Sequence, residues 1–212
     1  MPAYKSLQIK YLLTYEIQPF SNFWNLNQGT DTPDANSYKT IEINVTHPIR
    51  ATQLAIDFFQ RQKLGHGVVV HVSSVAAQMP FLMCPLYSAS KHAVSGFTRS
   101  LAGLEPSKNI RVNAVAPARV RTPLWTADKL LWIDEDNVVD WVTPEAVAEV
   151  MYDLITEDEH IGGTVLEVSL AGVRPVLNVN APAPAGGKGF GIEKRDDAVA
   201  QMFSALDSNF GK

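Results

Sequence analysis

The chain has 212 residues, of which 46% are hydrophobic and 19% are charged. This length and composition predict one globular domain with an ordinary core. Its 18 Lys and Arg residues against 22 Asp and Glu residues argue against a surface that binds nucleic acid or anionic lipid. The single cysteine, Cys84, excludes an internal disulfide and a cysteine-based zinc site. We therefore expect a reducing, cytoplasmic setting. We also expect no membrane span and no signal peptide, because no apolar run approaches the ~20 residues needed to cross a bilayer.

The first part of the chain predicts a helix followed by a strand. Residues 1–35 are the least regular part and end in a loop rich in Asn, Asp and Pro. From Tyr38 to Lys63 apolar residues recur near every 3.6 positions, which predicts a long helix with a kink at Pro48. The β-branched run VVVHV at 68–72 predicts a buried strand, and a loop follows over 73–86.

The middle of the chain continues this alternation. The sequence predicts a helix over 87–104, a strand over 111–116, a helix opened by Thr143 and Pro144, and a strand over 164–168. Helices that alternate with strands are typical of a parallel sheet covered by helices on its faces. We therefore predict an α/β fold.

The last part of the chain changes in composition. After residue 173 a segment rich in Pro, Ala and Gly predicts a linker. Beyond it one stripe of a predicted helix is apolar, made of Val199, Met202, Phe203, Leu206 and Phe210. We expect this helix to pack on the surface of its own domain. The alternative is a segment that docks a partner or acts as a lid.

Tyr87 and Lys91 are the first candidate catalytic residues. They are four residues apart at the start of a predicted helix, so both side chains leave one face at the carboxyl ends of the strands, where open α/β sheets bind ligands. A phenol with a pKa near ~10 is a poor acid or base at neutral pH, and a neighbouring ammonium lowers that pKa. This spacing by itself occurs by chance on many helices.

The context makes the pair specific. Ser74, thirteen residues before Tyr87, can donate to the substrate oxygen that the phenol protonates, and Ser73 is the competing hydroxyl. S-S-V-A-A, Y-S-A-S-K-H-A and R-V-N-A-V-A-P follow one another in order. This series resembles the short-chain dehydrogenase/reductase family over residues 38–173. The pieces D-W-V-T-P-E-A-V-A-E and G-G-T-V-L-E-V look most like its prostaglandin-dehydrogenase-like branch.

The resemblance implies a role for each matching residue. Tyr87 would move a proton to or from the carbinol oxygen while hydride passes to or from the nicotinamide. Lys91 would hold the ribose hydroxyls and lower the pKa of Tyr87, and Ser74 would polarise the carbonyl. Asn44, within I-E-I-N-V, would hold a water molecule in a proton relay from Lys91.

The cofactor contacts are only partly represented. Pro117, Val120 and Thr122 lie in the segment that matches the family's contacts with the nicotinamide, and Val120 and Thr122 match positions that contact its carboxamide and the phosphates. Ala118 stands where the family usually has glycine. The turn T-G-x-x-x-G-x-G, which the family uses for the pyrophosphate, does not occur, and neither does N-N-A-G. The glycine run at 186–191 lies in the predicted linker and does not fit that turn. The resemblance therefore implies an incomplete Rossmann-like, doubly wound parallel sheet that lacks its first β-α units.

This organisation leaves two interpretations open. We expect an irregular segment over 1–35, a catalytic half over 36–173, and a linker with a helix over 174–212. In the first interpretation the chain is a fragment of an NAD(P)-dependent oxidoreductase that interconverts a secondary alcohol and a ketone, with NADP slightly preferred. In the second it is an inactive accessory subunit that cannot bind dinucleotide by itself and binds a partner through an exposed sheet edge.

Substrate and partner expectations complete the picture. Two stretches, 80–86 and 122–142, are expected to choose the substrate. The second carries large apolar side chains at Leu124, Trp125, Leu130, Leu131, Trp132 and Trp141. They favour an apolar or aromatic small molecule, unless they only complete the core. The five histidines lack metal-ligand spacing, so we expect no metal. By resemblance, the helices at 38–63 and 87–104 imply a homo-oligomer.

Overall fold

The computed structural model describes residues 23–24, 37–123, 125, 127–130, 141–177 and 194–212. In this part of the chain the strands form a sheet in the order β1 (Gly67–Val72), β2 (Ile110–Pro117), β3 (Val165–Ser169) and β4 (Gly172–Pro175). The first three strands are parallel, and β4 runs antiparallel to β3. The predicted α/β fold with a parallel sheet is therefore confirmed, with an antiparallel strand at one edge.

The strand β4 was not predicted from the sequence. Its four residues are all exposed, so no buried apolar pattern marks them. The strand forms because the chain reverses tightly after β3, which pairs Ser169 with Gly172. Gly172 has a φ of +111°, a conformation that glycine adopts without strain. The tight turn after β3 therefore explains why β4 forms.

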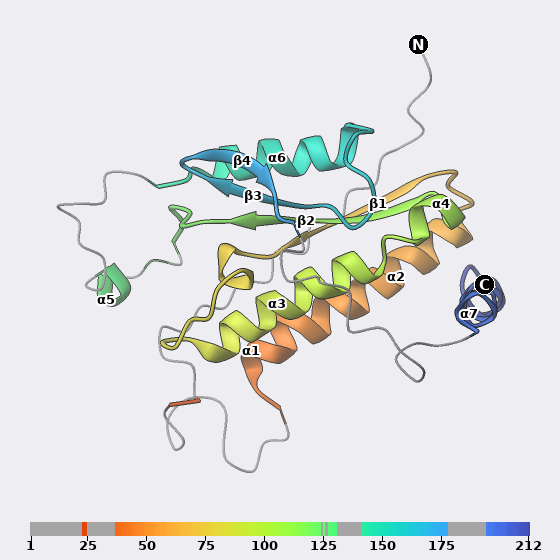
Figure 1. Cartoon of the computed structure of the whole chain (residues 1–212), viewed down its shortest axis with the longest axis horizontal. Helices are drawn as coiled ribbons and strands as arrows, with labels where there is room; N and C mark the ends of the chain where they lie inside the picture. Colours follow the sequence, from red (N-terminus) through yellow and green to blue (C-terminus); the bar gives the residue numbers. More distant parts are fainter. Residues whose placement is uncertain (1–22, 25–36, 124, 126, 131–140, 178–193) are drawn as a thin grey trace.

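Helices cover both faces of the sheet (Figure 1). One face carries α2 (His47–Arg61) and α3 (Pro85–Ser100), and the other carries α6 (Pro144–Thr156). The shorter or peripheral helices are α1 (Lys39–Ile41), α4 (Leu104–Lys108), α5 (Ala127–Leu130) and α7 (Arg195–Asn209). A π-helical turn, Glu42–Thr46, joins α1 to α2, and a 3₁₀ turn, Val75–Ala77, follows β1.

The predicted helix over 87–104 is wrong at both ends. The helix α3 begins two residues earlier, at Pro85, because proline fits the first turn, where its missing N–H has no helical partner to lose. It ends at Ser100, and α4 is a separate helix. Pro106 within α4 has no N–H to donate to the carbonyl of Ala102, so one continuous helix through this segment would lose that bond.

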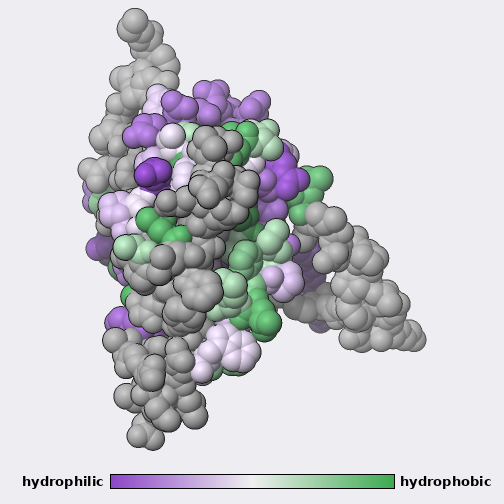
Figure 2. Space-filling model, turned by 90° about the vertical axis from the view of Figure 1, so that its left-hand side faces the viewer, coloured by the Kyte–Doolittle hydropathy of each residue, from purple (hydrophilic) through white to green (hydrophobic). Residues whose placement is uncertain are grey.

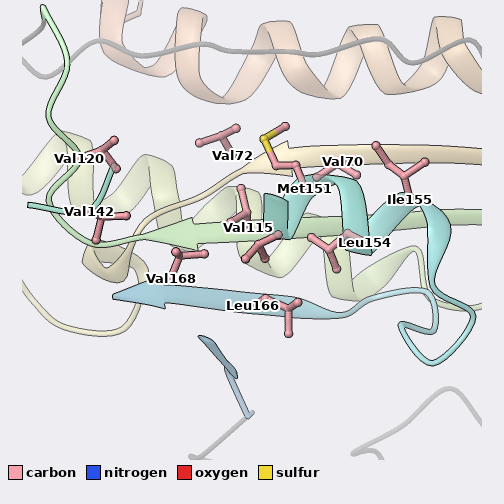
Figure 3. Packing of buried hydrophobic residues seen from close by; sticks show 11 residues of the cluster. Val70, Val72, Val115, Val120, Val142, Met151, Leu154, Ile155, Leu166 and Val168 are labelled. Atoms are coloured by element: carbon pink, nitrogen blue, oxygen red, sulfur yellow. The ribbon is translucent and has the colours of Figure 1, made fainter. Parts of the chain in front are cut away.

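The core lies on both sides of the central strands. Figure 3 shows the layer under α6, where Met151, Leu154 and Ile155 pack on the valines of β1 and β2. A second layer, which includes Ile56 and Phe59 of α2, packs on the opposite face. Strands that are covered on both faces have continuous rather than alternating apolar runs. This confirms the buried strand predicted from VVVHV.

Two polar residues of the R-V-N-A-V-A-P motif stabilise the end of α6. The guanidinium of Arg111 donates to the carbonyls of Ile155 at 3.0 Å and Glu157 at 2.8 Å. Asn113 Nδ2 donates to the carbonyl of His160 at 3.1 Å. These bonds satisfy carbonyls that the end of a helix leaves without an internal donor. Both residues are therefore structural, at the end of β2 opposite the candidate site.

The helix α7 packs on the domain surface. Phe203, Leu206 and Phe210 contact the apolar layer of α2, as the stripe predicted. Lys108 pairs with Asp207 of α7. Figure 1 places α7 near the far end of α2, away from the carboxyl ends of the strands, so α7 does not cover the candidate site. Its remaining stripe residues, Val199 and Met202, are exposed.

Several sequence expectations lie outside the described residues. They concern residues 1–22 and 25–36, the linker over 178–193, and the apolar residues Leu124, Leu131 and Trp132. The division of the chain into three segments therefore stays a prediction. Among the described helices, none is long and apolar enough to cross a bilayer.

A buried histidine links β1 to α2. His71 is 1% exposed, and its Nε2 lies 3.0 Å from Thr52 Oγ1. Thr52 Oγ1 donates its proton to the carbonyl of Pro48 at 2.8 Å, so His71 Nε2 must be the donor to Thr52. Burial, with a smaller contribution from the charge of Lys91, lowers the pKa of His71 to about 4. His71 is therefore a neutral structural group near pH 7.

This histidine predicts a stability loss in mild acid. Between pH 6.5 and 4 the unfolded chain binds a proton at His71 that the folded chain does not, so the free energy of unfolding falls as the pH falls. The loss should reach about 3 kcal/mol near pH 4. Urea denaturation of the wild type and His71→Gln at several pH values measures it. The variant should lose this dependence, whereas His66→Gln, which alters an exposed histidine, should keep it. Equal pH dependence in all three proteins would contradict the assignment.

Candidate active site

The helix α3 brings Tyr87 and Lys91 together against the end of β1. The ammonium of Lys91 lies 5.5 Å from the ring centroid of Tyr87 and donates to the carbonyl of Val72 at 3.0 Å. Both side chains are buried, with Tyr87 5% exposed and Lys91 0%. The spacing of four residues therefore places the two side chains in contact, as expected.

Burial changes the acidity of Lys91. Loss of solvent around the ammonium lowers the pKa of Lys91 to about 8. Lys91 therefore remains mostly protonated at pH 7. A positive charge beside a phenol favours the phenolate, so this arrangement suits proton transfer by Tyr87.

Asn44 lies in the π-helical turn and is completely buried. Its Nδ2 donates to Ser90 Oγ at 3.1 Å, and Ser90 Oγ donates to the carbonyl of Tyr87 at 2.7 Å. Asn44 Oδ1 has no hydrogen-bond partner among the described residues. A buried acceptor of this kind fits a small donor such as a water molecule.

The two serines after β1 have different environments. Ser73 is completely buried, and its Oγ bonds to Ser95 Oγ at 2.7 Å and to the carbonyl of Lys91 at 3.2 Å. Ser74 Oγ accepts from Ala76 N at 3.2 Å and donates to the carbonyl of Pro117 across a long 3.5 Å. A long bond is weak and easily exchanged. Ser74 is therefore the hydroxyl that can turn to a substrate oxygen, and Ser73 fixes α3 to the sheet.

The segment after β2 contains the remaining predicted cofactor contacts. Pro117 ends β2 and is buried. The side chain of Val120 points into the apolar layer beside Val142, so only its backbone can meet a ligand (Figure 3). Thr122 is half-buried. Ala118 does not have a positive φ, so the alanine that replaces the usual glycine is not strained.

Two serines that we did not predict hold the site together. Ser88 Oγ donates to the carbonyl of Ala76 at 3.0 Å, which ties α3 to the 3₁₀ turn after Ser74. Ser90 joins Asn44 to α3, as described above. The only sequence signal was the small polar pattern Y-S-A-S-K, whose serines could equally have faced solvent.

Apolar side chains surround the approach to this region. Figure 2 views the molecule from the side where the strands end, and hydrophobic residues are visible on that face. The loop before α3 exposes large apolar residues at Met79, Phe81, Leu82 and Met83. In the second predicted substrate stretch, the rings of Trp125 and Trp141 meet edge to face, with centroids 5.1 Å apart. Among the described residues, no three His, Cys, Asp or Glu side chains gather as metal ligands.

Known proteins resemble this chain in both sequence and structure. Human (Homo sapiens) 15-hydroxyprostaglandin dehydrogenase (NAD(+)) is 30% identical over 158 residues, which cover 68% of this chain and 59% of the relative. The structure of ElxO with NADP bound matches with a TM-score of 0.52 and 30% identity, covering 68% of this chain and 59% of that one. The complex of 4-hydroxyisoleucine dehydrogenase with NADH and succinate matches with a TM-score of 0.51 and 27% identity, covering 61% and 55%. The chain thus spans less than two thirds of the length of these relatives.

These likenesses confirm the Rossmann-like α/β fold, and the relatives are NAD or NADP proteins. The family model described as short chain dehydrogenase matches residues 25–130, half of the chain. This match includes the π-helical turn, β1 and all of α3 with its buried tyrosine and lysine. The chain belongs to the short-chain dehydrogenase family.

Proposed function

We propose that the chain is the catalytic portion of an NAD(P)-dependent oxidoreductase that interconverts a secondary alcohol and a ketone. The observation that carries the proposal is the contact between the buried Lys91 ammonium and the Tyr87 ring. Burial of a cation costs free energy, and such costs are concentrated at functional sites. Here the cation lies beside Tyr87, the proposed acid. NADP is the coenzyme to test first.

In the proposed reduction Tyr87 gives its hydroxyl proton to the ketone oxygen. Ser74, whose bond to the Pro117 carbonyl is long, turns its hydroxyl to the same oxygen and polarises the carbonyl. Lys91 stabilises the phenolate that remains, and a water molecule at Asn44 would return a proton toward Lys91. Oxidation of the alcohol reverses these steps. A bound nicotinamide would supply or accept the hydride.

The described residues fit one end of that cofactor. The buried acceptor of Asn44 and the Tyr87–Lys91 pair provide the polar groups expected near a nicotinamide ribose. Thr122 follows β2 at the same end of the sheet. The sequence holds no glycine-rich turn for the pyrophosphate, so the support for cofactor binding comes from the nicotinamide end alone.

We further propose an apolar or aromatic small molecule as the substrate. The exposed side chains of Phe81, Leu82 and Met83 support this choice, since they precede Tyr87 by a few residues. Apolar surface at the approach to a buried polar site favours a ligand with an apolar body and a single reactive oxygen.

Location and oligomeric state belong to the same proposal. A cytoplasmic location is supported by the single cysteine, which needs no oxidising compartment. A homo-oligomer through α2 and α3 is supported by Ile49 and Leu54 of α2, which are 39% and 54% exposed. Apolar residues at such positions suit a helix-to-helix interface between copies.

The proposed acid role predicts a large loss on removal of one oxygen atom. Tyr87→Phe should lower NADPH-dependent reduction of ketones by about 10²- to 10⁴-fold, the usual contribution of a general acid. Steady-state rates on a panel of aromatic and aliphatic ketones measure this loss. Tyr152→Phe, at an exposed tyrosine of α6, is the matched control and should keep full activity. Turnover by a folded Tyr87→Phe protein at the wild-type rate would remove Tyr87 as the acid.

The alternative function is an accessory subunit without activity of its own. One observation favours it: β1 is an edge of the described sheet, although helices bury both of its faces as in an interior strand. Such an edge can pair with a strand from a partner chain.

The two functions differ in dinucleotide binding. An accessory subunit that cannot bind dinucleotide by itself should show no saturable change in NADPH fluorescence at micromolar concentrations, whereas an oxidoreductase should bind NADPH through the groups at the nicotinamide end. Titration of the purified chain with NADPH measures this. Saturation at micromolar concentrations would exclude the accessory function and support the oxidoreductase.

A further inference from the structure

Two arginines that follow β2 in the chain both lie close to the ring of one tryptophan. The guanidinium carbons of Arg119 and Arg121 lie 5.4 Å and 5.9 Å from the ring centroid of Trp141. Val120, between them, is buried, so the two arginines leave the extended chain on its other side. Both arginines are exposed. This Arg119–Trp141–Arg121 cluster is therefore accessible to a ligand.

The backbone holds the cluster in place. Arg121 N donates to the carbonyl of Val142 at 3.1 Å, and Val142 N donates to the carbonyl of Arg119 at 3.0 Å. These two bonds join the chain after β2 to the chain before α6. Trp141 is also in edge contact with Trp125, whose Nε1 donates to the carbonyl of Val120 at 2.9 Å. These contacts therefore hold the indole of Trp141 in a fixed position beside both guanidinium groups.

The described residues do not balance the charge of the cluster. In the described part of the chain neither Arg119 nor Arg121 has a carboxylate within 4.0 Å, whereas Arg61 and Arg174 each pair with one. Two guanidinium groups beside one ring repel each other, and contact with the ring offsets this only in part. A bound anion would offset this repulsion and could accept hydrogen bonds from a guanidinium group.

The position of the cluster indicates which anion it serves. It directly follows the carboxyl end of β2 and adjoins Thr122, where open α/β sheets bind their ligands. We propose that Arg119 and Arg121 form a binding site for an anionic oxygen group of the ligand, either the pyrophosphate of the dinucleotide or the carboxylate end of an acidic substrate. This site deepens the proposed function, because it would compensate in charge for the glycine-rich turn that the sequence lacks.

The test measures anion binding without turnover. Inorganic pyrophosphate and malonate are the probes, titrated into the full chain at constant ionic strength and followed by calorimetry and tryptophan fluorescence. The wild type should bind at least one probe saturably. The double variant Arg119→Gln/Arg121→Gln should bind it at least 10-fold more weakly, while Arg195→Gln, an equal charge change on α7, should bind it as the wild type does.

The outcomes separate the possible ligands. Tighter binding of pyrophosphate assigns the site to the dinucleotide, and tighter binding of malonate assigns it to an acidic substrate. Lack of saturable binding of both probes would overturn the proposal, as would equal binding by a double variant that unfolds at the wild-type midpoint. Tyr87→Phe should bind the probes normally, so failure of the proposed reaction is distinguishable from failure of this site.

Discussion

The site depends on one buried cation. The ammonium of Lys91 lies between α3 and the end of β1, where it donates to the Val72 carbonyl and contacts the ring of Tyr87. Burial of this charge costs the fold on the order of 3 kcal/mol at neutral pH, the free energy that corresponds to its lowered pKa. The same charge contributes to keeping His71 neutral. Lys91 therefore joins α3 to the end of β1 and places a positive charge beside the ring of Tyr87.

Small hydroxyl and amide groups are buried with Lys91 around α3. Ser73, which follows β1, and Ser95 of α3 form a hydrogen bond with each other, and Ser90 joins Asn44 to the same helix. Each of these groups finds a partner in the protein, so it costs little inside the core. Among these groups, the Asn44 Oδ1 acceptor has no hydrogen-bond partner in the described part of the chain. A buried acceptor without a partner costs stability, and such costs are concentrated at functional sites.

Sequence reasoning succeeded where the pattern was local. The strands β1, β2 and β3 appeared as β-branched or apolar runs, and the Thr143 cap of α6 was recognisable from its own residues. It failed where no apolar period marks an element or where a contact joins distant segments. The strand β4 has no apolar face and forms through a tight turn, and α3 ends at Ser100 before α4 begins at Leu104. The bonds of Arg111 to the end of α6 connect residues 44 and 46 positions apart, which no periodic pattern shows.

The sequence by itself determined the family and the α/β order of elements, because these depend on residue types at short spacing, and it named the candidate site residues. Tertiary structure alone decided the chemical state of those residues. The depressed pKa of Lys91, the separation of Ser73 from Ser74 and the grouping of Arg119 and Arg121 around Trp141 all arise from burial and from contacts between segments far apart in the chain. Solvent exclusion and charge proximity are properties of the packed molecule, and a linear pattern of residues does not contain them.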